Sequence, residues 1–128
     1  MKNSIRVAPR LATALNDRGY KTLTPVQEAV LSSEMLGRDA IVSAQTGSGK
    51  TIAFGLSIST DVLTKERVSS TPKSLAALIV APTRELALQV KTELMWLYAN
   101  TEISIASCVG GMDMRTERRN LAKNPDIV

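Results

Sequence analysis

Short apolar runs alternate with longer amphipathic segments from residue 37 to the end of the chain. Four apolar runs predict buried strands: 39–44, 75–81, 103–109 and 125–128. The last run contains only the first residues of its predicted strand. Three segments between and after these runs predict helices: 49–65, 84–100 and 114–123. Within 84–100, one face carries Leu86, Val90, Leu94 and Leu97. Strands and helices in alternation are typical of an α/β domain with a parallel sheet.

The first 36 residues have a different, helical pattern. Pro9 lies near the start of one predicted helix, and Gly19 lies just past its end. A second helix is predicted to begin at Pro25, with Thr24 as its N-cap and Gly37 just past its end. We therefore divide the chain into a helical segment, 1–36, and an α/β unit, 37–128.

Composition narrows the class of protein. The chain has 128 residues, of which 44% are apolar and 22% charged, as expected of one globular domain. Aromatic residues make up only 3%, which favours parallel strands covered by helices over a β-sandwich. The net charge of +4 is a mild basic excess that suits phosphates or nucleic acid. No apolar run is long enough to span a bilayer, so no membrane contact is expected.

The cysteine and histidine content excludes two features, an internal disulfide and a metal site built on histidine. Cys108 is the single cysteine, so the chain forms no internal disulfide, and the sequence contains no histidine. A reducing, cytoplasmic location is the default expectation for such a chain.

The segment AQTGSGKT, residues 44–51, is the clearest chemical signal. It follows an apolar run and opens a predicted helix, which aims backbone N–H groups and the positive end of the helix dipole at one point. Lys50 would reach the β- and γ-phosphates of a nucleotide, and the Thr51 hydroxyl would bind Mg²⁺. The alternative is a glycine-rich turn without chemical meaning. The predicted cradle consists of Ala44, Gln45, Thr46, Gly47, Ser48, Gly49, Lys50 and Thr51.

Four segments together resemble the DEAD-box RNA helicases: GYKTLTPVQ (19–27), AQTGSGKT (44–51), APTRELALQ (81–89) and VGG (109–111). They are similar to the Q motif, motif I, motif Ia and the GG element of that family, in the same order. The resemblance implies a P-loop RecA-like parallel sheet with flanking helices, and ATP or ADP with Mg²⁺ as the ligand. It assigns Lys50 and Thr51 to a partial catalytic site.

The same resemblance implies roles for residues outside the glycine-rich segment. Gln27 would read the adenine edge, Tyr20 would stack on the base, and the backbone near Thr22 would lie beside it. RNA would contact this chain through its sugar-phosphate backbone, independently of sequence, at Pro82, Thr83, Arg84, Gly110 and Gly111. Simpler alternatives stay open, because Thr24 and Gln27 also form a capping-box pattern and Tyr20 could be a packing residue. The basic residues Arg115, Arg118, Arg119 and Lys123 fit a solvated helix face better than an RNA-facing stripe.

The 128 residues do not contain the TPGR, DEAD and SAT elements of the family, or its second RecA-like domain. We therefore expect a sheet truncated before the DEAD and SAT strands, and negligible ATP hydrolysis by this chain alone. Open strand edges predict either abnormal packing or association with a second copy. Two alternative functions are a non-catalytic nucleotide-binding or interaction module, and another P-loop enzyme such as a kinase.

Overall fold

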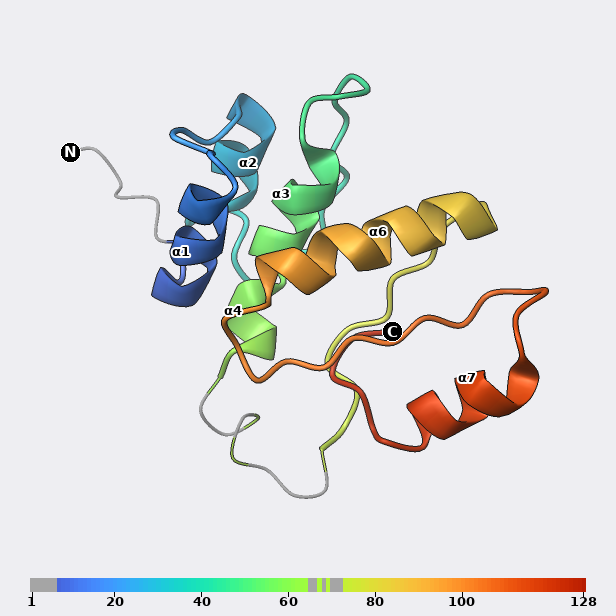
Figure 1. Ribbon diagram of the computed structural model, residues 1–128. Helices are drawn as coiled ribbons and strands as arrows, with labels where there is room; N and C mark the ends of the chain where they lie inside the picture. The colour runs from blue at the N-terminus through green and yellow to red at the C-terminus, as the bar shows by residue number, and fades with distance from the viewer. Residues whose placement is uncertain (1–6, 65–66, 68, 70–72) are drawn as a thin grey trace.

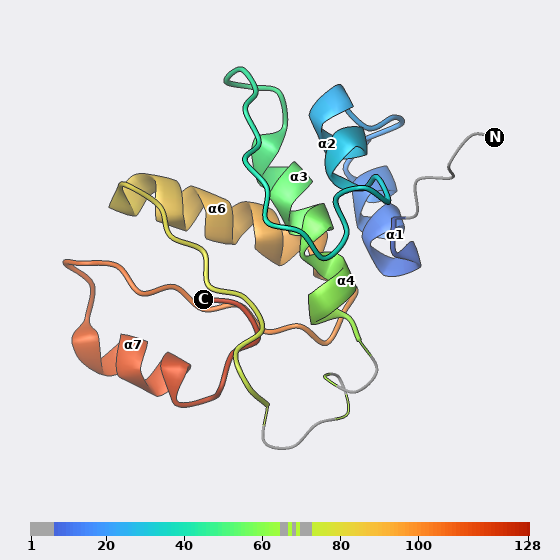
Figure 2. The same cartoon turned by 180° about the vertical axis from the view of Figure 1, so that it is seen from behind.

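The computed structural model describes residues 7–64, 67, 69 and 73–128. Its helices, labelled as in Figure 1, are α1 (Pro9–Asp17), α2 (Pro25–Val30), α3 (Lys50–Ser57), α4 (Ser59–Val62), α6 (Arg84–Leu97) and α7 (Met114–Leu121). Helix α6 lies across α3, and α7 stands apart from the other helices (Figures 1 and 2).

The two helices before residue 37 begin as predicted, but the second ends early. Thr24 and Gln27 form the complete capping box at the start of α2. We predicted that α2 would end just before Gly37, whereas it ends at Val30. Beyond it the chain makes single turns, such as the hydrogen bond of 3.1 Å from the Met35 N–H to the Ser32 carbonyl. Serine favours such turns over continued helix, which explains the shorter element.

The helix predicted over 49–65 is divided into α3 and α4 at Ile58. The Ser57 hydroxyl donates to the Phe54 carbonyl at 2.9 Å, and the Ser59 hydroxyl donates to the Leu56 carbonyl at 2.6 Å. Hydroxyl groups that bond to the preceding turn weaken a helix locally, so the break falls between these serines. The predicted end at residue 65 lies outside the described residues.

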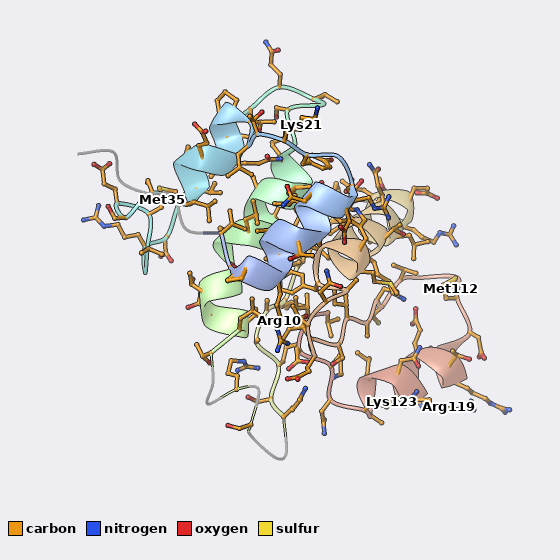
Figure 3. All side chains as sticks on the ribbon, turned by 60° about the vertical axis from the view of Figure 1, so that its left-hand side comes forward. Arg10, Lys21, Met35, Met112, Arg119 and Lys123 are labelled. Atoms are coloured by element: carbon orange, nitrogen blue, oxygen red, sulfur yellow. The ribbon has the colours of Figure 1, made fainter. Side chains whose placement is uncertain are left out.

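The helices predicted over 84–100 and 114–123 are confirmed with slightly shorter bounds. Thr83 caps α6 by accepting from the Leu86 N–H at 3.2 Å, and Asp113 caps α7 by accepting from the Arg115 N–H at 3.1 Å. Helix α6 buries three of the four predicted apolar positions but leaves Leu86 exposed. No residue of α7 is buried, and Arg119 points away from the rest of the chain (Figure 3).

Three of the predicted strands lie side by side as extended segments with little regular pairing. Isolated parallel bridges join Ile127 to both Ala77 and Ile105. The end of the chain therefore lies between 75–81 and 103–109, as Figures 1 and 2 show from opposite sides. The parallel direction is confirmed, but our prediction that 75–81 is fully buried is wrong. Leu78 is 66% exposed and Val80 is 84% exposed.

The strand predicted over 39–44 is also wrong for this structure. Among the described residues this segment joins no bridge, and the Ile41 side chain is fully exposed. A parallel strand is buried only when other strands flank it and helices cover it. Segment 39–44 leads into the glycine-rich loop without a neighbouring strand among the described residues, so its apolar side chains face solvent.

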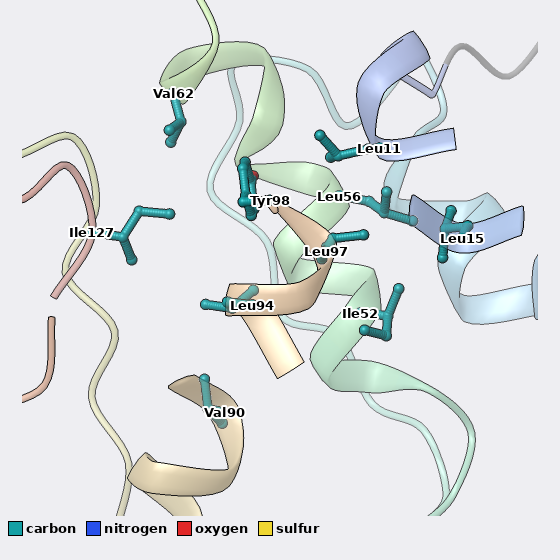
Figure 4. Close-up of a cluster of buried hydrophobic side chains, with 10 residues drawn as sticks. All are labelled: Leu11, Leu15, Ile52, Leu56, Val62, Val90, Leu94, Leu97, Tyr98 and Ile127. Carbon is teal, nitrogen blue, oxygen red and sulfur yellow. The ribbon is translucent and has the colours of Figure 1, made fainter. Parts of the chain in front are cut away.

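The core is formed between the helices and the end of the chain (Figure 4). Leu11 and Leu15 of α1, Ile52 and Leu56 of α3, and Val62 of α4 meet side chains of α6. The remaining members of this cluster are Val90, Leu94, Leu97, Tyr98 and Ile127. This packing fixes the direction of α3, and α3 in turn positions the glycine-rich loop.

Helices α3 and α6 approach closely at Gly55. A Cβ atom at this position would lie 2.7 Å from a Leu94 methyl group and 2.8 Å from a Leu97 methyl group. The Tyr98 hydroxyl, buried at the end of α6, donates to the Gly55 carbonyl at 2.7 Å. Burial raises the pKa of Tyr98 above its ordinary value.

Candidate functional site

The glycine-rich segment forms a loop that leads directly into α3 and projects beyond it at the top of Figure 1. Gly47 and Gly49 adopt φ angles of +80° and +84°, which L side chains rarely tolerate. The Lys50 ammonium donates to the Ala44 carbonyl, so the lysine closes the loop from its first residue to its last. Gly47 and Gly49 therefore hold backbone conformations that favour glycine.

The start of α3 offers hydrogen-bond donors without partners. No side chain caps the helix, so the N–H groups of its first turn have no intrahelical acceptor. The Ser48 hydroxyl is buried and has no hydrogen-bond partner among the residues that the structure describes. Uncapped amides, an orphaned hydroxyl and a lysine at one helix end form a donor set that suits an anionic ligand with several oxygens. Thr51, in the first turn of α3, is partly exposed.

Gln27 contacts this loop directly. Its amide nitrogen donates to the Gly49 carbonyl at 3.2 Å, and its amide oxygen accepts from the Thr24 N–H at 3.0 Å. The side chain is completely buried, and a Cβ atom on Gly49 would lie 2.4 Å from the Gln27 amide nitrogen. The capping interpretation of Gln27 is therefore confirmed. One amide N–H and one acceptor position on Gln27 are left over.

Tyr20 packs on a residue that the sequence did not connect with it. Its ring stacks on Trp96 at the end of α6, with centroids 5.9 Å apart and planes 25° from parallel. The Arg18 guanidinium lies 4.9 Å from the centre of the same tryptophan ring. Tyr20 is 37% exposed, and Thr22 is exposed on the loop that follows. In this structure Tyr20 is a packing residue, which is the simpler of the two alternatives.

The predicted RNA-contacting residues form a second, separate group. Arg84 donates to the Gly110 carbonyl at 3.2 Å, which joins the start of α6 to the loop before α7. Gly111 has a φ angle of +81°, and a Cβ atom there would lie 2.4 Å from the Arg84 guanidinium. Pro82 and Thr83 are exposed just before α6. A groove of about 360 Å³ runs from these residues along α6 and the extended segments 78–82 and 105–110.

The structure therefore brings the predicted residues together as two groups. In both Figure 1 and Figure 2, the glycine-rich loop before α3 and the loop before α7 project from different parts of the chain. Trp96 is the neighbour that sequence reasoning missed, because Tyr20 and Trp96 lie far apart in the sequence and no motif joins them.

Among the residues that the structure describes, no three acidic, cysteine or histidine side chains gather in a way that could hold a metal ion. None of the described helices combines the length and the hydropathy that crossing a bilayer requires.

Comparison with known proteins decides the family. The family model described as DEAD/DEAH box helicase matches residues 24–128. This chain belongs to the DEAD/DEAH box helicase family. The match begins at the capping residue of α2 and includes both groups of candidate site residues except Tyr20 and Thr22.

Individual members of the family resemble the chain over nearly its whole length. It is 38% identical to the ATP-dependent RNA helicase CshA of Listeria monocytogenes, over 93% of the chain and 22% of CshA. It is 41% identical to the ATP-dependent RNA helicase RhlB of Pseudomonas aeruginosa, over 93% of the chain and 30% of RhlB. The chain thus spans between a fifth and a third of the length of these relatives.

Solved structures confirm the family at the level of the fold. The RNA helicase Prp28 of Chaetomium thermophilum, solved with ADP bound, matches 99% of this chain with a TM-score of 0.81 and 31% identity, over 31% of the Prp28 chain. A hypothetical ATP-dependent RNA helicase from Sulfolobus tokodaii matches 93% of the chain with a TM-score of 0.77 and 28% identity, over 32% of its own chain. The α/β fold of DEAD-box helicase domains is therefore confirmed for this helicase-family chain, although few of its strands pair regularly.

Proposed function

We propose that this chain is the ATP-binding part of an ATP-dependent RNA helicase and that its glycine-rich loop holds the phosphates of ATP or ADP. One arrangement carries the proposal: the uncapped start of α3, the Lys50 ammonium and the unpartnered Ser48 hydroxyl lie in the same loop. The names of CshA and RhlB, and the ADP bound to Prp28, support the same ligand.

Each residue of the loop has a defined task in this proposal. Gly47 and Gly49 let the loop curve so that its amides converge on the phosphates. Lys50 exchanges the Ala44 carbonyl for phosphate oxygens, which are stronger acceptors because they are charged. The Thr51 hydroxyl holds Mg²⁺ together with the nucleotide. When bound, the ion neutralises part of the phosphate charge. Lys50 and Thr51 are thus the part of the catalytic site that this chain supplies.

Adenine recognition falls to the Q-motif segment. Gln27 keeps one N–H donor and one acceptor beyond its contacts with Thr24 and Gly49, and these suit the N7 acceptor and N6 amino group of adenine. Tyr20 and Thr22 lie seven and five residues before it on the same loop. We assign Tyr20 to base stacking and the Thr22 backbone to the rim of the base site.

RNA binding is assigned to the groove that Arg84 and Gly110 border. Exposed Pro82 and Thr83, the Arg84 guanidinium and the two glycines present small or charged groups that suit a sugar-phosphate backbone. Contacts of this kind read no base sequence, so binding is expected to be independent of RNA sequence. The single cysteine favours a reducing, cytoplasmic location.

A second copy of the chain is proposed as a further partner. Segments 39–44 and 75–81 expose apolar side chains, among them Ile41, Val42, Leu78 and Val80. Apolar extended segments without partners are typical sites of strand addition by another chain.

The phosphate cradle is tested by titrating a fluorescent ADP analogue into the wild-type chain and into Lys50→Met. Loss of a charge-assisted contact to phosphate is expected to weaken binding about 10- to 100-fold. Arg10→Met removes one positive charge from the exposed face of α1 and serves as the control. Equal affinity of Lys50→Met and the wild-type chain would refute the assignment of Lys50. With ATP in place of ADP, we expect binding with hydrolysis at background, since the assigned residues bind and orient but do not position an attacking water.

A further inference from the structure

Helix α7 carries a row of positive side chains along one side. Arg115, Arg118 and Arg119 lie within α7 at helical spacings of three and four residues, and Lys123 lies in the turn just past the end of the helix. All four are exposed, and in the described part of the chain none of them forms an ion pair. Figure 3 shows the Arg119 side chain extending into solvent. We call these four residues the basic face of α7.

The acidic groups of α7 do not neutralise this face. The Glu117 carboxylate is turned toward the preceding extended segment, where it accepts from the Val109 N–H at 2.9 Å and from the Cys108 thiol at 3.6 Å. The Asp113 carboxylate accepts from the Arg115 N–H at 3.1 Å and from the Thr116 hydroxyl at 2.8 Å. Both carboxylates are thus occupied in anchoring the helix, and none of the described residues pairs with the guanidinium groups of α7.

Helix stability does not account for all of these charges. Arg118 and Arg119 lie in the last turn, where positive charge interacts favourably with the helix dipole. Arg115 lies in the first turn, where the dipole disfavours a cation, and three arginines within two turns repel one another. A ligand with negative charge would remove this repulsion.

Helix α7 follows directly along the chain from the segment proposed to contact RNA. The Arg84 guanidinium donates to the Gly110 carbonyl, and the chain runs from Gly111 through the Asp113 cap into α7. Figure 1 shows the extended segment before α7 turning back into the start of that helix. The eight residues of α7 span about 12 Å, which is about three nucleotides of a strand at its axial repeat.

We propose that the basic face of α7 binds the phosphates of the same RNA strand that lies against Arg84 and Gly110. This inference rests on the proposed RNA site and extends it by one helix. Arginine suits the task because its planar guanidinium binds phosphate through two N–H groups. The face has no aromatic side chain, so its contribution is to affinity and not to base selection.

The test is RNA binding followed by fluorescence anisotropy, with a labelled oligouridylate at several salt concentrations. Arg115→Gln combined with Arg119→Gln removes two positive charges from exposed helical positions. If each arginine neutralises one phosphate, the slope of log affinity against log salt falls by about 1.4. The matched control, Arg10→Gln with Arg38→Gln, changes the net charge equally on other surfaces. It separates a local contact from the effect of total charge.

The outcomes separate the inference from the function on which it rests. A weaker, less salt-dependent complex for the α7 variant, with the control unchanged, is the expected result. If Arg84→Gln weakens binding but the α7 variant binds as the wild type does, the proposed RNA site stands and the basic face is overturned. Absence of RNA binding by the wild-type chain overturns both. The inference also falls if the α7 substitutions abolish binding to anionic phosphatidylserine vesicles while leaving RNA affinity unchanged.

Discussion

The Gln27 side chain makes two hydrogen bonds, one within segment 19–27 and one to the glycine-rich loop. It accepts from the Thr24 N–H and donates to the Gly49 carbonyl while completely buried. A change in the conformation of the loop therefore alters the position of Gln27, the residue proposed to read adenine. A change at Gln27 likewise alters the position of Gly49. The same amide thus has a structural task and a proposed recognition task.

Substitution of Gln27 by alanine is expected to lower the free energy of unfolding by about 1–3 kcal/mol, because the Thr24 N–H and the Gly49 carbonyl lose their partner. Urea denaturation measures the change. Glu28→Ala, at the adjacent exposed position of α2, is the control. If Gln27→Ala and Glu28→Ala are equally stable, the two hydrogen bonds do not hold the loop.

Substitution of Ser48 by alanine should have opposite effects on stability and on binding. The Ser48 hydroxyl is buried without a partner, so its removal is expected to leave the free energy of unfolding unchanged or to raise it by up to about 1 kcal/mol. Nucleotide affinity should fall, because the ligand loses a donor. Denaturation and calorimetry of the same preparation measure both. A fall in stability together with unchanged nucleotide affinity would contradict this account of the site.

At the scale of elements, Tyr98 connects α6 to α3. Its hydroxyl donates to the Gly55 carbonyl, and burial raises its pKa. The unfolded tyrosine ionises near its ordinary pKa of about 10, whereas the folded tyrosine stays protonated at that pH. The stability that the buried hydroxyl contributes is therefore fully present below about pH 10 and is lost as the pH rises further.

Comparison of the wild-type chain with Tyr98→Phe tests this link between helices. Near neutral pH the wild type should be more stable by about 1 kcal/mol, the net contribution of one buried hydrogen bond. The difference should shrink as the pH rises above about 10, and thermal unfolding at a series of pH values up to and beyond this pH measures it. A difference that stays constant over this range would show that Tyr98 ionises alike in both states.

Elements whose signals are local were predicted well. Helix α6 follows from its apolar spacing, and α1 follows from Pro9 near its start and Gly19 just past its end. The segments after Val30 and Ser57 were predicted as continuous helix. The first forms single turns and the second is interrupted, because serine hydroxyls and single turns compete with the helical hydrogen bonds. Strand prediction failed at 39–44, since burial of a strand depends on segments that pair with it.

At the scale of the whole molecule, the two candidate sites differ in how far the sequence revealed them. The glycine-rich loop was predicted from adjacent residues, and its positive φ angles occur at Gly47 and Gly49. The contact between Arg84 and Gly110 joins distant segments, and only family resemblance placed both in one site. The stacking of Tyr20 on Trp96 had no sequence signal, because it depends on how α6 lies beside the loop after α1.

The exposed apolar side chains of 39–44 and 75–81 predict association of this chain with itself. Ile41, Leu78 and Val80 are more than half exposed, and extended segments of this kind pair with other chains. The mass measured by light scattering should rise with protein concentration. Leu78→Lys combined with Val80→Lys should prevent the rise, because a charged edge repels a second copy. A constant monomer mass for the wild-type chain would refute the prediction.

The central claim is that this chain forms a nucleotide site at the start of α3, with adenine read beside it. Calorimetric titration of the wild-type chain with Mg-ADP, and separately with Mg-GDP, tests it most directly. The account predicts saturable binding of Mg-ADP and much weaker binding of Mg-GDP, since the free N–H and oxygen of Gln27 match adenine and not guanine. Equal binding of the two nucleotides would contradict adenine reading by Gln27. Binding of neither would contradict the phosphate cradle itself.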